Sequence, residues 1–127
     1  MEQYHRPHNK KVKSGTGGRR RKFRDKKASH LGGVFAATKV ADKDLKVPVR
    51  GRGGSTGIKL KKASKVNVVL KDGKMKSVAI KRLLESHNPE YVRMNIITRG
   101  AVVETELGKV RVTNRVGQDG VVNGVVV

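Results

Sequence analysis

Two glutamates are the first candidates for chemistry in this sequence. Glu104 and Glu106 lie two residues apart in a segment rich in β-branched residues, so a strand would place both carboxylates on one face. Such a pair could serve in acid–base catalysis or bind a metal ion. A solvated strand face, on which the carboxylates balance Lys109 and Arg111, explains the same pattern. We favour this second interpretation because no histidine or serine lies in register with the two glutamates.

The histidines are the other candidate ligands for a metal ion. They are His5, His8, His30 and His87, and the sequence contains no cysteine. His5 and His8 have a suggestive spacing, but a closed zinc site needs four good ligands. We therefore predict that the chain has no catalytic residues, no metal site, no cofactor and no small-molecule substrate, and that it is not an enzyme.

Two basic glycine-rich segments carry the remaining candidate chemistry, at 14–24 and at Arg50–Gly57. A phosphate loop of an NTPase would require GxxxxGK[ST] between a strand and a helix, and that spacing is absent. Glycines nevertheless let backbone N–H groups approach phosphates closely, and the arginine fork matches phosphate oxygens. A flexible, solvated linker is the alternative. We favour phosphate contact because both segments combine glycines with arginines on a strongly basic chain.

The overall charge points to a polyanionic partner. Thirty Lys and Arg stand against ten Asp and Glu, a formal net charge of +20. Residues 1–62 hold nineteen of these cations and four of the acids, so most of the excess lies in the half with the least core-forming material. Only 3% of residues are aromatic, too few for a platform that stacks bases. The expected partner is therefore structured RNA, recognised through its phosphate backbone and its shape.

Neither a membrane segment nor a secretory signal is expected. No apolar run approaches the roughly twenty residues of a membrane span, and the N-terminal residues are too polar for a signal peptide. The prediction is a soluble protein inside the cell.

The strands that must position these residues are most regular over 95–127. Lys109–Thr113 alternates charged and apolar side chains, which is the period of a strand with one buried and one solvated face. Its β-branched residues pack well on a pleated surface. Turns that contain glycine divide the segment at Arg99-Gly100, Leu107-Gly108, Asp119-Gly120 and Asn123-Gly124. A compact antiparallel β module is predicted here.

Further strands are predicted upstream of this module. Ile58–Leu60 alternates, and Val66–Leu70 joins Met75–Ile80 through Asp72-Gly73, a strong hairpin signal. Six or seven short strands between Ile58 and Val127 predict an all-β fold. We expect a small antiparallel β-barrel of about six strands with a basic, largely extended N-terminal arm; an open two-layer arrangement is the alternative.

Three shorter segments complete the prediction. Asn88-Pro89-Glu90 has the order of a helix start, so one turn of helix is predicted over 89–93. Residues 81–86 could continue a strand or form a helical turn, and Val47-Pro48-Val49 could be an edge strand. The predicted parts are a basic arm at 1–30 that is disordered when free, a connecting segment with the Arg/Gly loop at 31–57, and the barrel body at 58–127.

Four stretches of the sequence resemble the small-subunit ribosomal protein S8e family, in its compact archaeal form. These are NIITRGAVVETELGKVRVTNRVGQDGVVNGV, SGTGGRRRKFRDKK, AATK and RGRGGS. Two departures from the family pattern are visible: His30-Leu31-Gly32-Gly33 replaces Glu-Leu-Gly-Arg, so that an acid and an arginine are lost, and Ser55 stands where asparagine is common. The resemblance implies a β-barrel with basic extensions threaded into small-subunit rRNA, next to other ribosomal proteins in the cytoplasm, and no catalytic activity.

Together, the charge pattern and the resemblance predict a structural rRNA-binding protein. A free-standing RNA chaperone or rRNA-processing factor on a basic β-barrel is the alternative. The residues predicted to bind RNA are Lys10, Lys11, Lys13, Thr16, Gly17, Gly18, Arg19, Arg20, Arg21, Lys22, Arg24, Lys26, Lys27, Lys39, Arg50, Arg52, Gly53 and Gly54.

Overall fold

The computed structural model describes residues 3–4, 15, 18 and 30–127, with the backbone alone for residues 3, 4 and 52. The chain divides into two compact units, Met1–Phe35 and Ala36–Val127. In the first unit, β1 (Gln3–Tyr4) pairs antiparallel with β2 (Leu31–Gly32). Almost all of the predicted basic arm lies outside the described residues, so its disorder in the free protein and the three predicted domain boundaries stay predictions.

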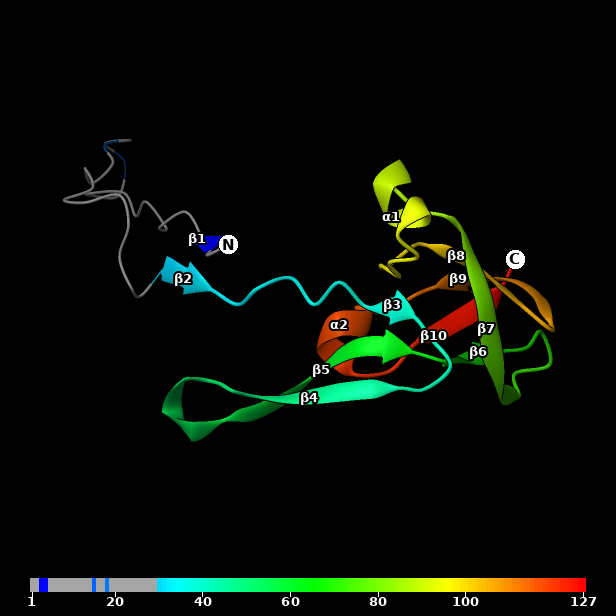
Figure 1. Ribbon diagram of the computed structural model, residues 1–127, viewed down its shortest axis with the longest axis horizontal. Coiled ribbons are helices and arrows are strands. Elements are labelled where there is room, and N and C mark those ends of the chain that lie inside the picture. Colours follow the sequence, from blue (N-terminus) through cyan, green and yellow to red (C-terminus); the bar gives the residue numbers. More distant parts are fainter. Residues whose placement is uncertain (1–2, 5–14, 16–17, 19–29) are drawn as a thin grey trace. The chain divides into compact units, whose positions relative to one another are not determined.

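Five strands of the second unit close into a barrel (Figure 1). They are β6 (Lys65–Val69), β7 (Met75–Glu85), β8 (Val102–Thr105), β9 (Gly108–Val112) and β10 (Asn123–Val126). Consecutive strands pair antiparallel, whereas β10 closes on β6 in parallel. A ring with an odd number of alternating strands must contain one such parallel pair. The predicted all-β barrel is thus confirmed.

The core of the barrel follows the alternation of the sequence. In β9, Val110 and Val112 are buried while Lys109 and Arg111 are exposed, as the period of two predicts. The other strands supply mainly branched side chains to the same cluster. Its members include Val66, Val68, Val78, Ile80, Val103, Val116 and Val122, and Leu60 and Ala63 join it from outside the ring.

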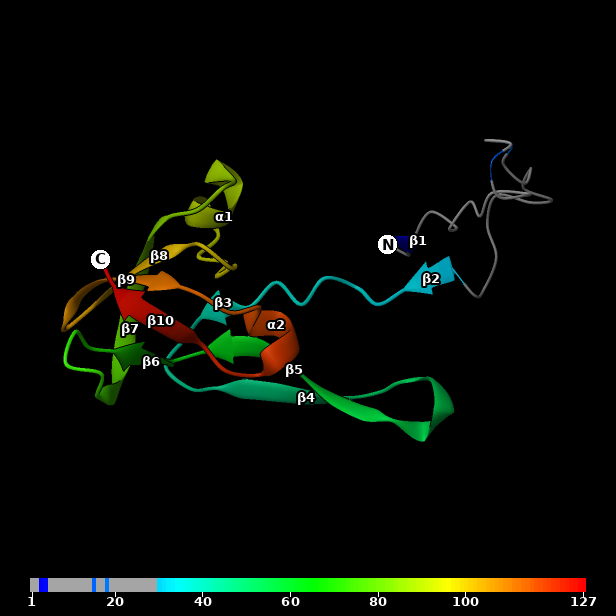
Figure 2. The same ribbon diagram turned by 180° about the vertical axis from the view of Figure 1, so that it is seen from behind.

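A second sheet of three strands, in the order β3-β5-β4, lies beside the barrel (Figure 2). Its strands are β3 (Lys39–Val40), β4 (Leu45–Arg50) and β5 (Thr56–Ala63), and the short 3-10 turn η2 (Arg52–Gly54) joins the last two. β4 pairs only with β5, so Pro48 lies in an edge strand, as predicted. We call residues 45–63 the β4–β5 hairpin.

Most connections of the barrel match the sequence signals, but the turn predicted at Asn123-Gly124 is wrong, because both residues lie inside β10 and pair with its neighbours. The Asp72-Gly73 turn joins β6 to β7, with Gly73 at a φ of 76°. β7 continues to Glu85, so residues 81–85 form a strand and not a helical turn. The helix α1 (Pro89–Arg93) begins after Asn88, whose side chain accepts a hydrogen bond from the Glu90 N–H, so the predicted helical turn is confirmed.

A four-residue helix, α2 (Val116–Asp119), forms where the sequence predicted only a turn. Gly117 lies against the chain that leads into the barrel: a β-carbon there would be 2.6 Å from Cβ of Ala36. In the same leading segment, the buried Thr38 hydroxyl donates to the Leu60 carbonyl at 2.6 Å. Close contacts with α2 and β5 therefore fix the point at which the chain enters the second unit.

Candidate nucleic-acid interface

The β4–β5 hairpin concentrates positive charge without any negative charge. Residues 45–63 include six Lys or Arg and no Asp or Glu: Lys46, Arg50, Arg52, Lys59, Lys61 and Lys62. The hairpin runs out past the barrel in Figures 1 and 2, with η2 at its tip. A projecting ribbon with cations from tip to base can lie along a phosphate backbone.

The tip of the hairpin has an open, glycine-dependent geometry. Arg50 pairs with Thr56 at the end of the ladder, and the Gly51 N–H donates to the Ser55 carbonyl at 2.6 Å. Gly53 and Gly54 then adopt φ angles of 72° and 79°, which side chains with a β-carbon rarely accept. A β-carbon on either glycine would have no atom within 4 Å, so the required conformation, and not crowding, explains these glycines. The tip backbone is therefore accessible to a phosphate.

A seventh cation meets the hairpin at its base. Lys39 in β3 is the register partner of Lys62 in β5, and both are exposed. Like charges directly opposite each other on a sheet are destabilising in the free protein. A phosphate placed between them would remove that repulsion, and this favours an anionic partner at this site.

A single carboxylate anchors the base without neutralising it. Asp44 accepts hydrogen bonds from the Ser64 N–H at 2.7 Å and from the Ser64 hydroxyl at 2.8 Å. Burial by itself raises the pKa of the Asp44 carboxyl, but these two hydrogen bonds and the charges of Lys46 and Lys65 outweigh it and lower the pKa below its ordinary value. The charged carboxylate thus fixes the start of β4 to the junction between β5 and β6.

The predicted RNA-binding residues divide into two groups in the structure. Lys39, Arg50, Gly53 and Gly54 lie on the three-stranded sheet or at its tip, as does the backbone of Arg52. Gly18 is described and exposed. Outside the described residues lie Lys10, Lys11, Lys13, Thr16, Gly17, Arg19, Arg20, Arg21, Lys22, Arg24, Lys26 and Lys27.

Sequence reasoning did not include the lysines along the hairpin stem. Lys46, Lys59, Lys61 and Lys62 extend the charge of the tip to the base of the sheet. Lys61 is the extra residue at a register shift, because Leu45 pairs with Lys62 while Lys46 pairs with Leu60. The available signal was the absence of acids from the whole 45–63 segment, but the pairing of β4 with β5 was needed to bring these lysines together on one hairpin. Lys46 lies on the face of Leu60, and Lys59 lies on the opposite face with Val47.

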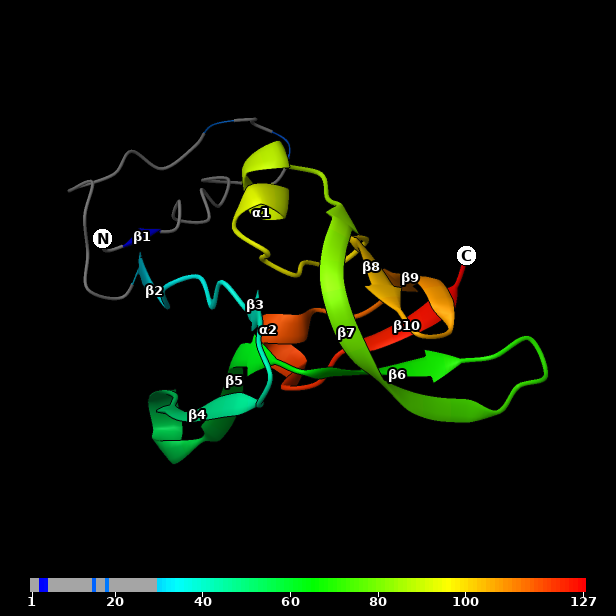
Figure 3. The ribbon, with the colours of Figure 1, turned by 45° about the vertical axis from the view of Figure 1, so that its right-hand side comes forward.

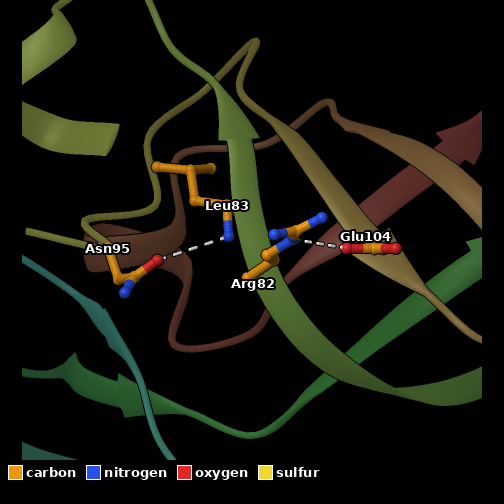
Figure 4. A network of polar contacts seen from close by, with 4 residues as sticks. All are labelled: Arg82, Leu83, Asn95 and Glu104. Atoms are coloured by element: carbon orange, nitrogen blue, oxygen red, sulfur yellow. Dashed lines mark hydrogen bonds and ion pairs between the residues drawn. The ribbon is translucent and has the colours of Figure 1, made fainter. Parts of the chain in front are cut away.

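Glu104, the candidate for catalysis, is held by an ion pair. Its carboxylate accepts from Nε of Arg82 at 2.6 Å, across the pairing of β7 with β8 (Figure 4). The ion pair is made with Arg82, which the sequence interpretation did not name. Lys109, which it did name, is the register partner of Glu104 in β9, whereas Arg111 lies opposite Val102. Close by, Asn95 at a φ of 52° accepts the Leu83 N–H through its side chain at 3.4 Å.

The described residues offer no other centre for chemistry. Within residues 3–4, 15, 18 and 30–127, no group of three or more His, Asp or Glu side chains could hold a metal ion. His87 makes an edge-to-face contact with Tyr91, and its Nδ1 lies 3.4 Å from the Thr98 hydroxyl. None of the described helices is long and apolar enough to cross a membrane.

Comparison with known proteins places these features in a family. The family model described as ribosomal protein S8e matches residues 7–127 of the chain. The match therefore includes the barrel, the β4–β5 hairpin and most of the segment predicted to be a basic arm.

Individual relatives match over most of their own length. The chain is 42% identical over 112 residues to the small ribosomal subunit protein eS8 of Staphylothermus marinus, covering 87% of this chain and 88% of that protein. The protein of the same name from Sulfolobus acidocaldarius is 46% identical over 110 residues, 85% of this chain and 86% of the relative. The protein of the same name from Hyperthermus butylicus is 40% identical over 123 residues, which cover 94% of this chain and 90% of the relative.

Proposed function

This chain belongs to the ribosomal protein S8e family, and from that premise we propose that it is a structural constituent of the small ribosomal subunit that binds and stabilises folded rRNA. Its place of action is then the cytoplasm, within the small subunit. Its partners are small-subunit rRNA and neighbouring ribosomal proteins, and its role requires no catalytic step.

The observation that carries the RNA part of this proposal is the charge of the β4–β5 hairpin. Six cations without an acid, on a ribbon that extends beyond the barrel, would repel one another in the free protein. Binding to phosphates replaces that repulsion by attraction and releases the counterions of the RNA. The glycines at the tip allow the backbone N–H groups to approach as well.

The hairpin acts together with the basic residues before position 30. The three consecutive arginines at 19–21 and the lysines around them supply charge of the same sign without core-forming residues. In this proposal both segments bind phosphates, and the barrel fixes the orientation of the hairpin on the RNA.

Co-sedimentation tests the proposed function. The full chain is added to a reconstitution of small subunits from rRNA and small-subunit proteins, and the subunits are then washed in high salt. A structural constituent stays with the subunit at about one copy, because many phosphate contacts must break together for it to leave. A free-standing chaperone or processing factor washes off or binds at variable copy number, and that result would reject the proposal.

A further inference from the structure

An exposed apolar patch crosses three neighbouring strands of the barrel. Met75 in β7 is the register partner of Val69 in β6, and Val69 is the register partner of Val125 in β10. Their side chains point away from the core, because the neighbouring Val68 side chain is buried in the core and a β-carbon on the neighbouring Gly124 would meet the core residue Val110. The exposed fractions are 68% for Met75, 37% for Val69 and 40% for Val125. Val127 extends the row with 67% exposure, and we call these four residues the Met75 patch.

The register makes the Met75 patch continuous. Side chains directly opposite each other on paired strands have Cβ atoms about 4.5–5.5 Å apart, so three partners in a row form one apolar surface. Exposed apolar side chains scattered singly need no explanation, but a contiguous group edged by polar residues marks an interaction site. No described side chain covers these four residues to the extent of burying them.

The edge of the patch is positively charged. The β6–β7 turn places the exposed Lys71 and Lys74 directly beside the Val69–Met75 pair, and only Asp72 opposes them there. On the other side, Arg111 in β9 is the register partner of Val125, and the Lys109 carbonyl accepts the Val127 N–H, with Glu104 in β8 opposite Lys109. An apolar centre with a cationic edge is complementary to a partner surface that has an apolar centre and carboxylates at its edge.

The location of the patch separates it from the proposed RNA surface. In Figures 1, 2 and 3 the β6–β7 turn lies at one end of the second unit and the tip of the β4–β5 hairpin at the other. Phosphates would engage the four cations but would leave the apolar row without a partner. A second copy of this chain would bring the same cations face to face.

We propose that the Met75 patch docks a protein neighbour in the small subunit, one that presents apolar side chains edged by Asp or Glu. The inference rests on the proposed function, because it takes the small subunit as the setting. It assigns the two ends of the second unit to different partners: RNA at the hairpin and protein at the β6–β7 end.

Unique thiols test the docking directly, because the chain contains no cysteine. Met75→Cys places a thiol in the patch, and Met94→Cys places one at another exposed methionine, 41% exposed and outside the patch. The rate of maleimide labelling is measured for the full chain alone, with rRNA only, and in small subunits reconstituted from rRNA and the other small-subunit proteins. Co-sedimentation of the labelled chain is recorded in each case.

The expected result is protection that depends on protein. With rRNA only, the Met75→Cys thiol is labelled as fast as in the free chain. In the complete subunit it is labelled roughly tenfold more slowly or slower still, because the centre of a protein interface excludes solvent. Met94→Cys is slowed less. A maleimide-linked photocrosslinker at position 75 is expected to react with a protein at a site flanked by Asp or Glu.

Four outcomes would overturn the inference. Protection with rRNA only would make the patch an RNA surface, and equal protection at Met94 would mean general shielding. A thiol that reacts freely in a subunit that has retained the chain would reject the docking but leave the proposed function intact. A chain that fails to co-sediment would reject the proposed function, and this inference with it.

Charge reversal tests the carboxylate edge of the partner. Arg111→Glu is introduced into the Met75→Cys chain, with Arg115→Glu, an exposed arginine next to α2, as the matched control. Arg111→Glu should return the labelling rate in complete subunits most of the way to that with rRNA only, because like charges would meet at the edge. Equal protection in the two variants would contradict an acidic partner.

Discussion

Residues 45–63 contain six Lys and Arg and no Asp or Glu, whereas residues 65–127 contain eleven and six. The barrel therefore balances much of its charge within itself, as the Arg82–Glu104 ion pair illustrates. The β4–β5 hairpin contains no acid of its own, and its strands bury only Leu60 and Ala63. In the proposed function, this difference corresponds to a barrel that acts as a scaffold and a hairpin that acts as the RNA-recognition element.

The glycines of the two regions differ in the same way. At the hairpin tip, Gly53 and Gly54 have open space around them and are needed for their left-handed backbone. In the barrel, the φ of Gly124 lies outside the left-handed region, but a β-carbon at this position would collide with the Val110 side chain and the Arg111 carbonyl. Tight packing holds the barrel strands together, and an open backbone leaves the tip free to bind.

The largest effect is expected at Gly124. In Gly124→Ala the new β-carbon would lie 2.5 Å from Cγ1 of Val110 and 2.8 Å from the Arg111 carbonyl oxygen. We expect a loss of about 3 kcal/mol in the free energy of unfolding, because the fully buried β9–β10 contact must separate. The matched Gly57→Ala in the hairpin, where the nearest atom is 3.9 Å away, should change it by less than about 0.5 kcal/mol. Urea denaturation measures both, and equal losses would remove the contrast between the regions.

A smaller effect is expected where the hairpin is attached to the rest of the unit. Thr38→Val keeps the shape of the buried side chain but removes the hydroxyl that donates to the Leu60 carbonyl. We expect a loss of about 1–3 kcal/mol, the cost of a buried group left without its partner. Thr113→Val removes a longer, exposed hydrogen bond to the Asn123 carbonyl and should cost less than about 0.5 kcal/mol. If both cost the same in urea denaturation, the Thr38 contact does not fix the hairpin.

The smallest effect concerns the pH dependence of the hairpin base. The lowered pKa of Asp44 means that its stabilising contribution is complete above its unfolded pKa of about 4 and is lost as the pH falls through the lower folded pKa. Asp44→Asn should therefore be less stable than the parent at pH 7, and the two should converge below about pH 4. Urea midpoints at several pH values measure this. A constant difference between the two proteins at all pH values would show that the charge of Asp44 is not what matters.

Local sequence signals predicted the barrel well. Alternation in Lys109–Thr113, the Asp72-Gly73 turn and the Asn88-Pro89 helix start each depend on neighbouring residues, and each is confirmed. The number of strands in the ring is five, near the predicted value of about six, because β5 lies in the second sheet although Leu60 and Ala63 pack in the barrel core. Alternation reveals a strand but not which sheet it joins.

The candidate interface was predicted less completely. Arg50 and the tip glycines could be identified, since glycine next to arginine is visible in a short window. The stem lysines could not, because their assembly on one hairpin depends on the pairing of β4 with β5 and of Lys39 with Lys62. The partner of Glu104 was also missed, because Arg82 is 22 residues away in the chain. Contacts between distant strands leave no trace in local spacing.

The salt dependence of rRNA binding tests the division between scaffold and recognition element most directly. Two variants of the full chain each lose three exposed cations: Lys46→Gln, Arg50→Gln and Lys62→Gln in the hairpin, or Lys71→Gln, Lys74→Gln and Lys76→Gln around the β6–β7 turn. Each phosphate contact contributes about 0.7–0.9 to the slope of log affinity against log salt. We predict that the hairpin variant loses about two to three units of slope on small-subunit rRNA while the barrel variant stays near the parent protein. Equal losses in the two variants would mean that net charge alone drives binding, and they would contradict a dedicated RNA contact at the hairpin.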